Sequence, residues 1–185
     1  MAKFKNQYRI EPARLKNWDY AQCAAYYITI CTAKREPFFG KIENQEMIPS
    51  PIGRIVEQEW VKTPEIRPDM NIELGEFVVM PNHFHGIIFI GNNEFNKVRI
   101  GSDAMHRVST DDVYKNEFGP QSKNLSSILR GFKSAVTVQS RNINPEFGWQ
   151  ARFYDHIIKN PTSYDVISQY IIDNPKKWID DEFNE

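Results

Sequence analysis

Two histidines separated by one bulky apolar residue are the part of this sequence best suited to chemistry. His83 and His85 flank Phe84, with Val- and Ile-rich sequence on both sides. Because side chains alternate across a β-strand, we expect both imidazoles on one face of a sheet and Phe84 on the other. Two imidazoles held on a rigid strand form half of a metal site. The alternative interpretation is a pair of polar side chains on a solvated sheet face.

A third ligand must then come from elsewhere, and the last predicted helix is the better source. Tyr170 and Asn174 are four residues apart, so they face the same way on a helix. Asn174 is a candidate carbonyl-oxygen ligand, and Tyr170 is a candidate nucleophile because a phenol can bond covalently to phosphorus. Tyr154 competes for this role, and its strand neighbour His156 is another candidate ligand. Tyr170 taken alone also fits a core residue with a hydrogen-bonded hydroxyl.

The elements that must position these residues follow from the apolar pattern and from the helix caps. Ser50, Asn124 and Asn160 are N-cap residues, and a proline follows the first and the last of them. The predicted order is a buried strand (24–32), a polar hairpin (40–48), a helix from 51, strands at 71–80 and 83–90, a helix from 125, a strand at 153–158 and a helix from 161. This order predicts an α+β fold, with a mostly antiparallel sheet and helices packed on one face.

Length and composition limit the classes of protein that fit. The chain has 185 residues, 41% of them hydrophobic and 13% aromatic, which predicts a globular protein. No run of ~18 apolar residues is present, so we expect no membrane span. The two cysteines match no zinc motif and form no disulfide framework, which favours the cytoplasm. We expect an N-terminal arm (1–22), one domain (23–178) with a flexible insertion (91–123), and an acidic tail (179–185).

The stretch from Met80 to Gly86 resembles the HUH motif (His, bulky apolar residue, His) of single-tyrosine transposases. The resemblance covers roughly residues 24 to 178. It continues in segments 27–31 and 128–136, and the blocks 149–160 and 170–175 resemble the REP-associated tyrosine transposase branch. It implies an RRM-like or ferredoxin-like sheet with Mg²⁺ or Mn²⁺ as cofactor. It also implies the following site: His83, His85 and Asn174 as metal ligands, Tyr170 as the nucleophile that forms a 5′-phosphotyrosine, and His156 as an orienting residue.

The same resemblance implies single-stranded or hairpin DNA as the partner of a monomer or homodimer. Such DNA requires cations along a groove and aromatic side chains for its bases. The net charge of -1 means that any basic surface must be local. The candidate DNA-binding cations are Lys34, Arg35, Arg130, Lys133, Arg141, Arg152, Lys159, Lys176 and Lys177. The alternatives are a noncatalytic RRM-like nucleic-acid-binding module and a domesticated, inactive transposase.

Overall fold

A four-stranded antiparallel sheet forms the centre of the computed structural model, with strand order β6-β7-β3-β8. The described residues are 3–4, 7–8, 18–96, 122–181 and 183–184, so most of the predicted arm and of the predicted insertion lies outside them. Two small antiparallel pairs, β1-β2 and β4-β5, stand apart from this sheet. The strand bounds are β1 Lys3–Phe4, β2 Gln7–Tyr8, β3 Ala24–Cys31, β4 Gly40–Glu43, β5 Glu46–Pro49, β6 Ile72–Val79, β7 His83–Ile90 and β8 Tyr154–Ile158.

The helices begin where the sequence places their caps. The side chains of Ser50, Asn124 and Asn160 each accept a hydrogen bond from a backbone N–H three residues later, at 2.8 to 3.0 Å. None of the described helices is long and apolar enough to cross a membrane. The bounds are η1 Ala33–Arg35, α1 Pro51–Val61, α2 Thr63–Ile66, η2 Pro68–Met70, α3 Leu125–Arg141, α4 Pro161–Asp173 and η3 Asn174–Asp180.

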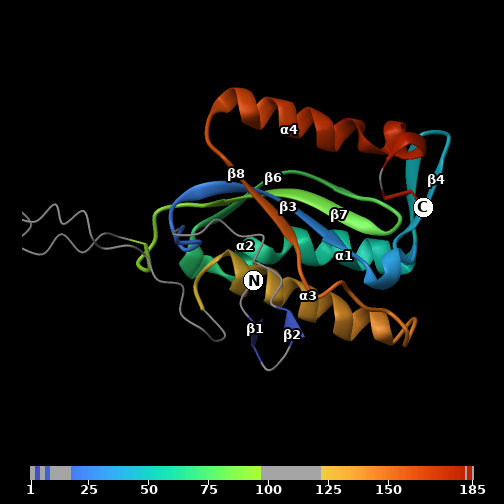
Figure 1. The fold of residues 1–185 in the computed structure, drawn as a ribbon, viewed down its shortest axis with the longest axis horizontal. Helices are drawn as coiled ribbons and strands as arrows, with labels where there is room; N and C mark the ends of the chain where they lie inside the picture. Colours follow the sequence, from blue (N-terminus) through green and yellow to red (C-terminus); the bar gives the residue numbers. More distant parts are fainter. Residues whose placement is uncertain (1–2, 5–6, 9–17, 97–121, 182, 185) are drawn as a thin grey trace, which may run out of the picture.

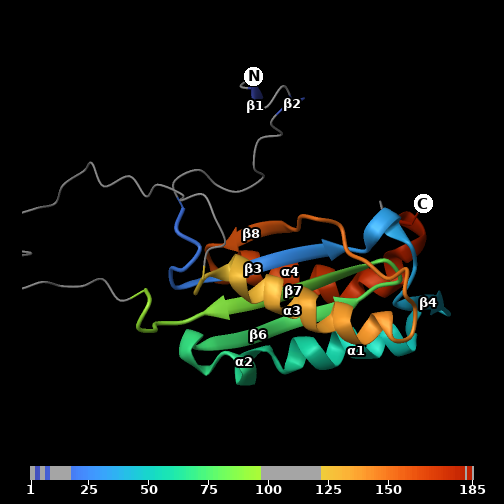
Figure 2. The ribbon, with the colours of Figure 1, turned by 90° about the horizontal axis from the view of Figure 1, so that it is seen from below.

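The helices lie in two layers, one on each side of the sheet. Figure 1 shows α1, α2 and α3 below the sheet and α4 above it, and Figure 2 shows α1 and α3 in front of the strands. The α+β class and the antiparallel sheet are confirmed. The position of α4 differs from the expectation that all helices share one face. The reason is that the second face is also apolar, because Ile87 and Ile158 form a separate buried cluster with Ile171 of α4.

Alternation along the two central strands separates the main core from the face under α4. Tyr26, Ile28 and Ile30 of β3 are fully buried in the larger cluster, together with Phe84 of β7. Phe84 packs edge-on against Trp60 of α1, with ring centroids 4.8 Å apart. The intervening β3 residues and the two histidines therefore face α4.

Candidate active site

β7 places His83 and His85 side by side on the face under α4, as the alternation predicts. Their ring centroids are 4.5 Å apart, and their exposed fractions are 0% and 1%. Burial, together with the nearby His85 and Arg35, lowers the pKa of His83 to about 2. Burial alone lowers the pKa of His85 to about 3. Both imidazoles are therefore neutral near pH 7, and neutral imidazole is the form that binds metals.

The tautomer of His83 is set by Asn82, the residue before it. The amide nitrogen of Asn82 donates to the carbonyl oxygen of Phe183 at 2.7 Å, which fixes the orientation of the amide. Asn82 Oδ1 then faces His83 Nδ1 at 2.9 Å and can only accept, so Nδ1 carries the proton. The lone pair of His83 lies on Nε2, which is buried and has no hydrogen-bond partner among the described residues.

Asn174 brings a second buried polar side chain up to His83. It follows the last residue of α4, is 1% exposed, and its Oδ1 has no hydrogen-bond partner among the described residues. Its side chain interacts with His83 and opposes the fall in the pKa of that imidazole. No group of three or more His, Cys, Asp or Glu side chains in the described part of the chain is placed to hold a metal. A metal site here thus depends on the amide oxygen. Two imidazole nitrogens with one amide oxygen suit Mn²⁺ better than Mg²⁺, which prefers oxygen ligands.

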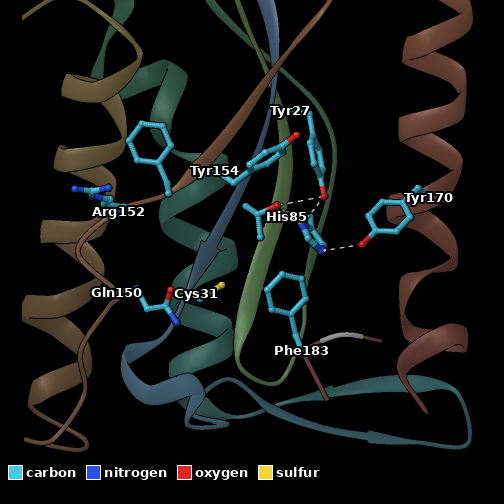
Figure 3. Close-up of a pocket in the computed structure, with 10 residues that line it drawn as sticks. Tyr27, Cys31, His85, Gln150, Arg152, Tyr154, Tyr170 and Phe183 are labelled. Atoms are coloured by element: carbon cyan, nitrogen blue, oxygen red, sulfur yellow. Dashed lines mark hydrogen bonds between the residues drawn. The ribbon is translucent and has the colours of Figure 1, made fainter. Parts of the chain in front are cut away.

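Tyr170 reaches the histidines from α4. Its hydroxyl lies 3.5 Å from Nε2 of His85, and 39% of the residue is exposed. Figure 3 shows Tyr170 pointing from α4 toward His85. Both residues line a pocket with a volume of about 470 Å³. Tyr154, the competing candidate nucleophile, lines the same pocket from β8 and is 54% exposed. The hydrogen bond to His85 distinguishes Tyr170 from Tyr154.

Two polar residues of β3 belong to the site but were not singled out in the sequence. Tyr27 Oη lies 2.8 Å from His85 Nδ1, and Thr29 Oγ1 lies 2.9 Å from the same atom. The register explains these contacts, because Thr29 pairs directly with His85 on the neighbouring strand. The alternation of side chains within β3 predicts that the hydroxyls of Tyr27 and Thr29 share one face of the sheet, which could have indicated their place in the site. Using this signal requires knowing that β3 pairs with β7.

The C-terminal tail covers the histidine pair. The ring of Phe183 lies 4.5 Å from that of His83 and 6.1 Å from that of His85, measured between centroids. The Arg35 guanidinium lies over the Phe183 ring, 5.0 Å from its centroid. Trp178 of η3 adds a further ring 6.0 Å from His83. The described tail residues thus form one wall of the site, which the acidic composition of the tail did not indicate.

His156 lies at the edge of this face. It pairs with Tyr27 across β3 and β8, and its side chain is exposed. No hydrogen bond among the described residues joins it to either buried histidine or to Tyr170. Its predicted orienting role stays a prediction.

The nine candidate DNA-binding cations lie in several different surroundings. Arg35 and Arg152 border the site, although the Arg152 guanidinium turns toward α3 (Figure 3). Lys133 of α3 donates to the carbonyl oxygen of Gln150 at 2.6 Å, and burial lowers its pKa. The remaining six lie in other surroundings: Lys34 exposed in η1, Arg130 in a pocket of α3 with Arg67, Arg141 on the Phe147 carbonyl, Lys159 beside the start of α4, Lys176 paired with Asp173, and Lys177 exposed in η3.

Comparisons with known proteins place the chain in a family. No family model matches it. An uncharacterized protein of Haemophilus influenzae is 37% identical over 170 residues, which cover 91% of this chain and 89% of that protein. A solved structure of a REP-associated tyrosine transposase bound to a REP hairpin superposes with a TM-score of 0.54 at 18% identity, covering 93% of this chain and 73% of that one. The chain therefore belongs to the same family as the Haemophilus influenzae protein. It has the same fold as the REP-associated tyrosine transposase.

Proposed function

We propose that this protein cleaves and rejoins single-stranded DNA, beside a hairpin, through a covalent bond to Tyr170. The fold it shares with a transposase bound to a REP hairpin supports this choice of substrate. His83, His85 and Asn174 would hold a divalent metal through two imidazole nitrogens and one amide oxygen. When bound, such a metal polarises the scissile phosphate and offsets its developing charge.

The chemistry assigned to the protein is a transesterification at phosphorus. Tyr170 Oη attacks the phosphorus and loses its proton as the new P–O bond forms. The bond from phosphorus to the 3′ oxygen breaks, and that oxygen leaves as a 3′-hydroxyl after gaining a proton. The 5′ side remains attached as a phosphotyrosine. Attack by a second 3′-hydroxyl reverses the step and joins two strands without a nucleotide cofactor.

One observation carries the proposal: two buried polar atoms, His83 Nε2 and Asn174 Oδ1, have no hydrogen-bond partner among the described residues. His83 packs against His85, which contacts the hydroxyl of Tyr170. Leaving a buried polar atom unpaired costs about 1–3 kcal/mol, so two in one place require an explanation. Metal ligation satisfies both lone pairs. A pocket of about 470 Å³, lined by His85 and Tyr170, leaves room for a phosphate.

The test is formation of a covalent DNA adduct. The purified protein is incubated with single-stranded oligonucleotides carrying a REP-type hairpin, with Mn²⁺ or with EDTA, and DNA-linked peptides are mapped by mass spectrometry. We expect a Mn²⁺-dependent adduct on Tyr170 that the Tyr170→Phe variant does not form. The matched variant is Tyr154→Phe, which removes a second tyrosine hydroxyl of the pocket and should retain the adduct.

Two outcomes would contradict this proposal in different ways. If Tyr170→Phe retains the adduct and Tyr154→Phe loses it, the nucleophile is Tyr154. The second outcome is that neither the wild-type protein nor any variant forms an adduct. If the hairpin also binds equally well with and without metal, and equally well to the wild type and to His83→Ala, the protein is a noncatalytic DNA-binding module.

A further inference from the structure

We propose that Tyr27 is a positioning residue, which holds the His85 imidazole with its proton on Nδ1 and its Nε2 lone pair directed at the site. Of the two measurements that test this inference, only the measurement of metal binding rests on the proposed function. The Tyr27 hydroxyl lies 2.8 Å from His85 Nδ1, the shorter of the two contacts that this nitrogen makes.

The network around Tyr27 favours its oxygen as the acceptor. Thr29 Oγ1 donates to Tyr27 Oη at 3.2 Å, and, besides burial, a further hydrogen bond to Tyr170 raises the pKa of Tyr27, as expected when the phenol donates its proton. With its proton donated to Tyr170, Tyr27 can only accept from His85 Nδ1. The rings of Tyr27 and His85 stack at 5.5 Å with an interplanar angle of 26°, which limits rotation of the imidazole. Burial raises the pKa of Tyr27, so the phenol stays neutral and does not introduce a charge.

The opposite nitrogen of His85 gives a second reason for this tautomer. Nε2 faces the hydroxyl of Tyr170 at 3.5 Å, and it can accept from that hydroxyl only if the ring proton is on Nδ1. Ligating histidines generally donate their other N–H to an oxygen, which fixes the tautomer and the ring direction. Tyr27 stands in this relation to His85, as Asn82 does to His83.

Tyr27 also contacts the proposed nucleophile. Its ring meets that of Tyr170 edge-on, with centroids 6.3 Å apart, and the two phenols interact electrostatically. A single side chain of β3 therefore touches both His85 and Tyr170, which come from β7 and α4. This links the orientation of the ligand to that of the nucleophile.

The test compares Tyr27→Phe with Tyr26→Phe in the full-length protein. Tyr26 is the adjacent residue and also carries a hydrogen-bonded phenol, which accepts from Trp18 Nε1 at 3.1 Å on the opposite face. Both variants lose one hydroxyl and keep the ring, so their costs in packing are similar. The first readout is the tautomer of His85 in the metal-free protein, from long-range ¹H–¹⁵N correlation spectra. The second readout is the dissociation constant for Mn²⁺, from isothermal titration calorimetry.

We expect Nδ1–H in the wild-type protein and in Tyr26→Phe, and a shift toward Nε2–H in Tyr27→Phe. Loss of an outer partner of a ligating histidine typically weakens metal binding about 10- to 100-fold, so this range is expected for Tyr27→Phe alone. An unchanged tautomer in Tyr27→Phe, or Nε2–H already in the wild type, would overturn the inference. So would a Mn²⁺ affinity that stays within about threefold of a measurable wild-type value, well below the usual range. If the wild type binds no Mn²⁺, the proposed metal site is wrong, and the tautomer comparison alone decides the role of Tyr27.

Discussion

Replacing Asn174 with leucine should make the metal-free protein more stable while removing its response to metal. Leucine keeps a side chain of similar size at a position that is 1% exposed, and it removes Oδ1, which has no hydrogen-bond partner among the described residues. A buried polar atom without a partner costs about 1–3 kcal/mol, so its removal should return roughly 1 kcal/mol or more. For a domain of this size, 1 kcal/mol corresponds to a Tm change of about 2–4 °C.

The metal response should change in the opposite direction. A ligand at about 100 times its Kd stabilises the native state by about 2.7 kcal/mol. The wild-type Tm should therefore rise by roughly 5–11 °C in Mn²⁺ at that ratio. Asn174→Leu leaves only the two imidazoles, so most of this rise should disappear. The assay is differential scanning calorimetry of each protein with EDTA and with Mn²⁺.

Asn93 offers the matched control, because its side chain is also buried but both its amide nitrogen and its Oδ1 form hydrogen bonds. Its amide nitrogen donates to the carbonyls of Met70 and Gly91 at 3.1 and 3.0 Å, and its Oδ1 accepts from the Phe95 N–H at 2.9 Å. Asn93→Leu leaves those partners unpaired and should cost on the order of 3 kcal/mol, with the Mn²⁺ response retained. The reasoning fails if metal-free Asn174→Leu loses more than about 1 kcal/mol, because Asn174 would then be structurally satisfied like Asn93. It also fails if Asn174→Leu keeps the full Mn²⁺ shift.

Three further outcomes follow from individual contacts. Burial raises the pKa of Tyr26 to about 12, above its value in the unfolded chain. The contribution of Tyr26 to the free energy of unfolding is therefore fully present below about pH 10 and falls by roughly 1.4 kcal/mol per pH unit between about pH 10 and 12. Urea titrations across this range should show a smaller fall in Tyr26→Phe. Phe183→Ala removes the ring that covers His83, so diethylpyrocarbonate should modify that histidine several-fold faster by mass spectrometry; equal rates would show that the tail does not shield it. Arg152→Ala should weaken binding of single-stranded DNA and reduce the salt slope by about 0.7, whereas Arg130→Ala, in a separate pocket, should leave the slope unchanged.

Local sequence is enough to predict the helices and strands and the shared face of the two histidines. The β-branched run with one residue between His83 and His85 predicts a strand with both imidazoles on one face, and their contacts agree. The caps Asn124 and Asn160 predict where α3 and α4 begin, and both helices start one residue later. These features depend on residues within one or two turns of each other, so pattern and capping chemistry suffice.

The position of α4 and the contacts of the two histidines were decided by tertiary structure. Both faces of the sheet are apolar, so the pattern alone does not say which face a helix covers, and α4 took the face opposite α1 and α3. Tyr27 lies 58 residues from His85, and only the register of β3 against β7 brings their polar atoms to 2.8 Å. Asn82 and Phe183 are joined across 101 residues. Local patterns specify which side chains share a face of a strand or helix. The pairing of distant strands and the return of the C-terminal tail decided what those side chains touch, because these contacts depend on chain segments that no local pattern relates.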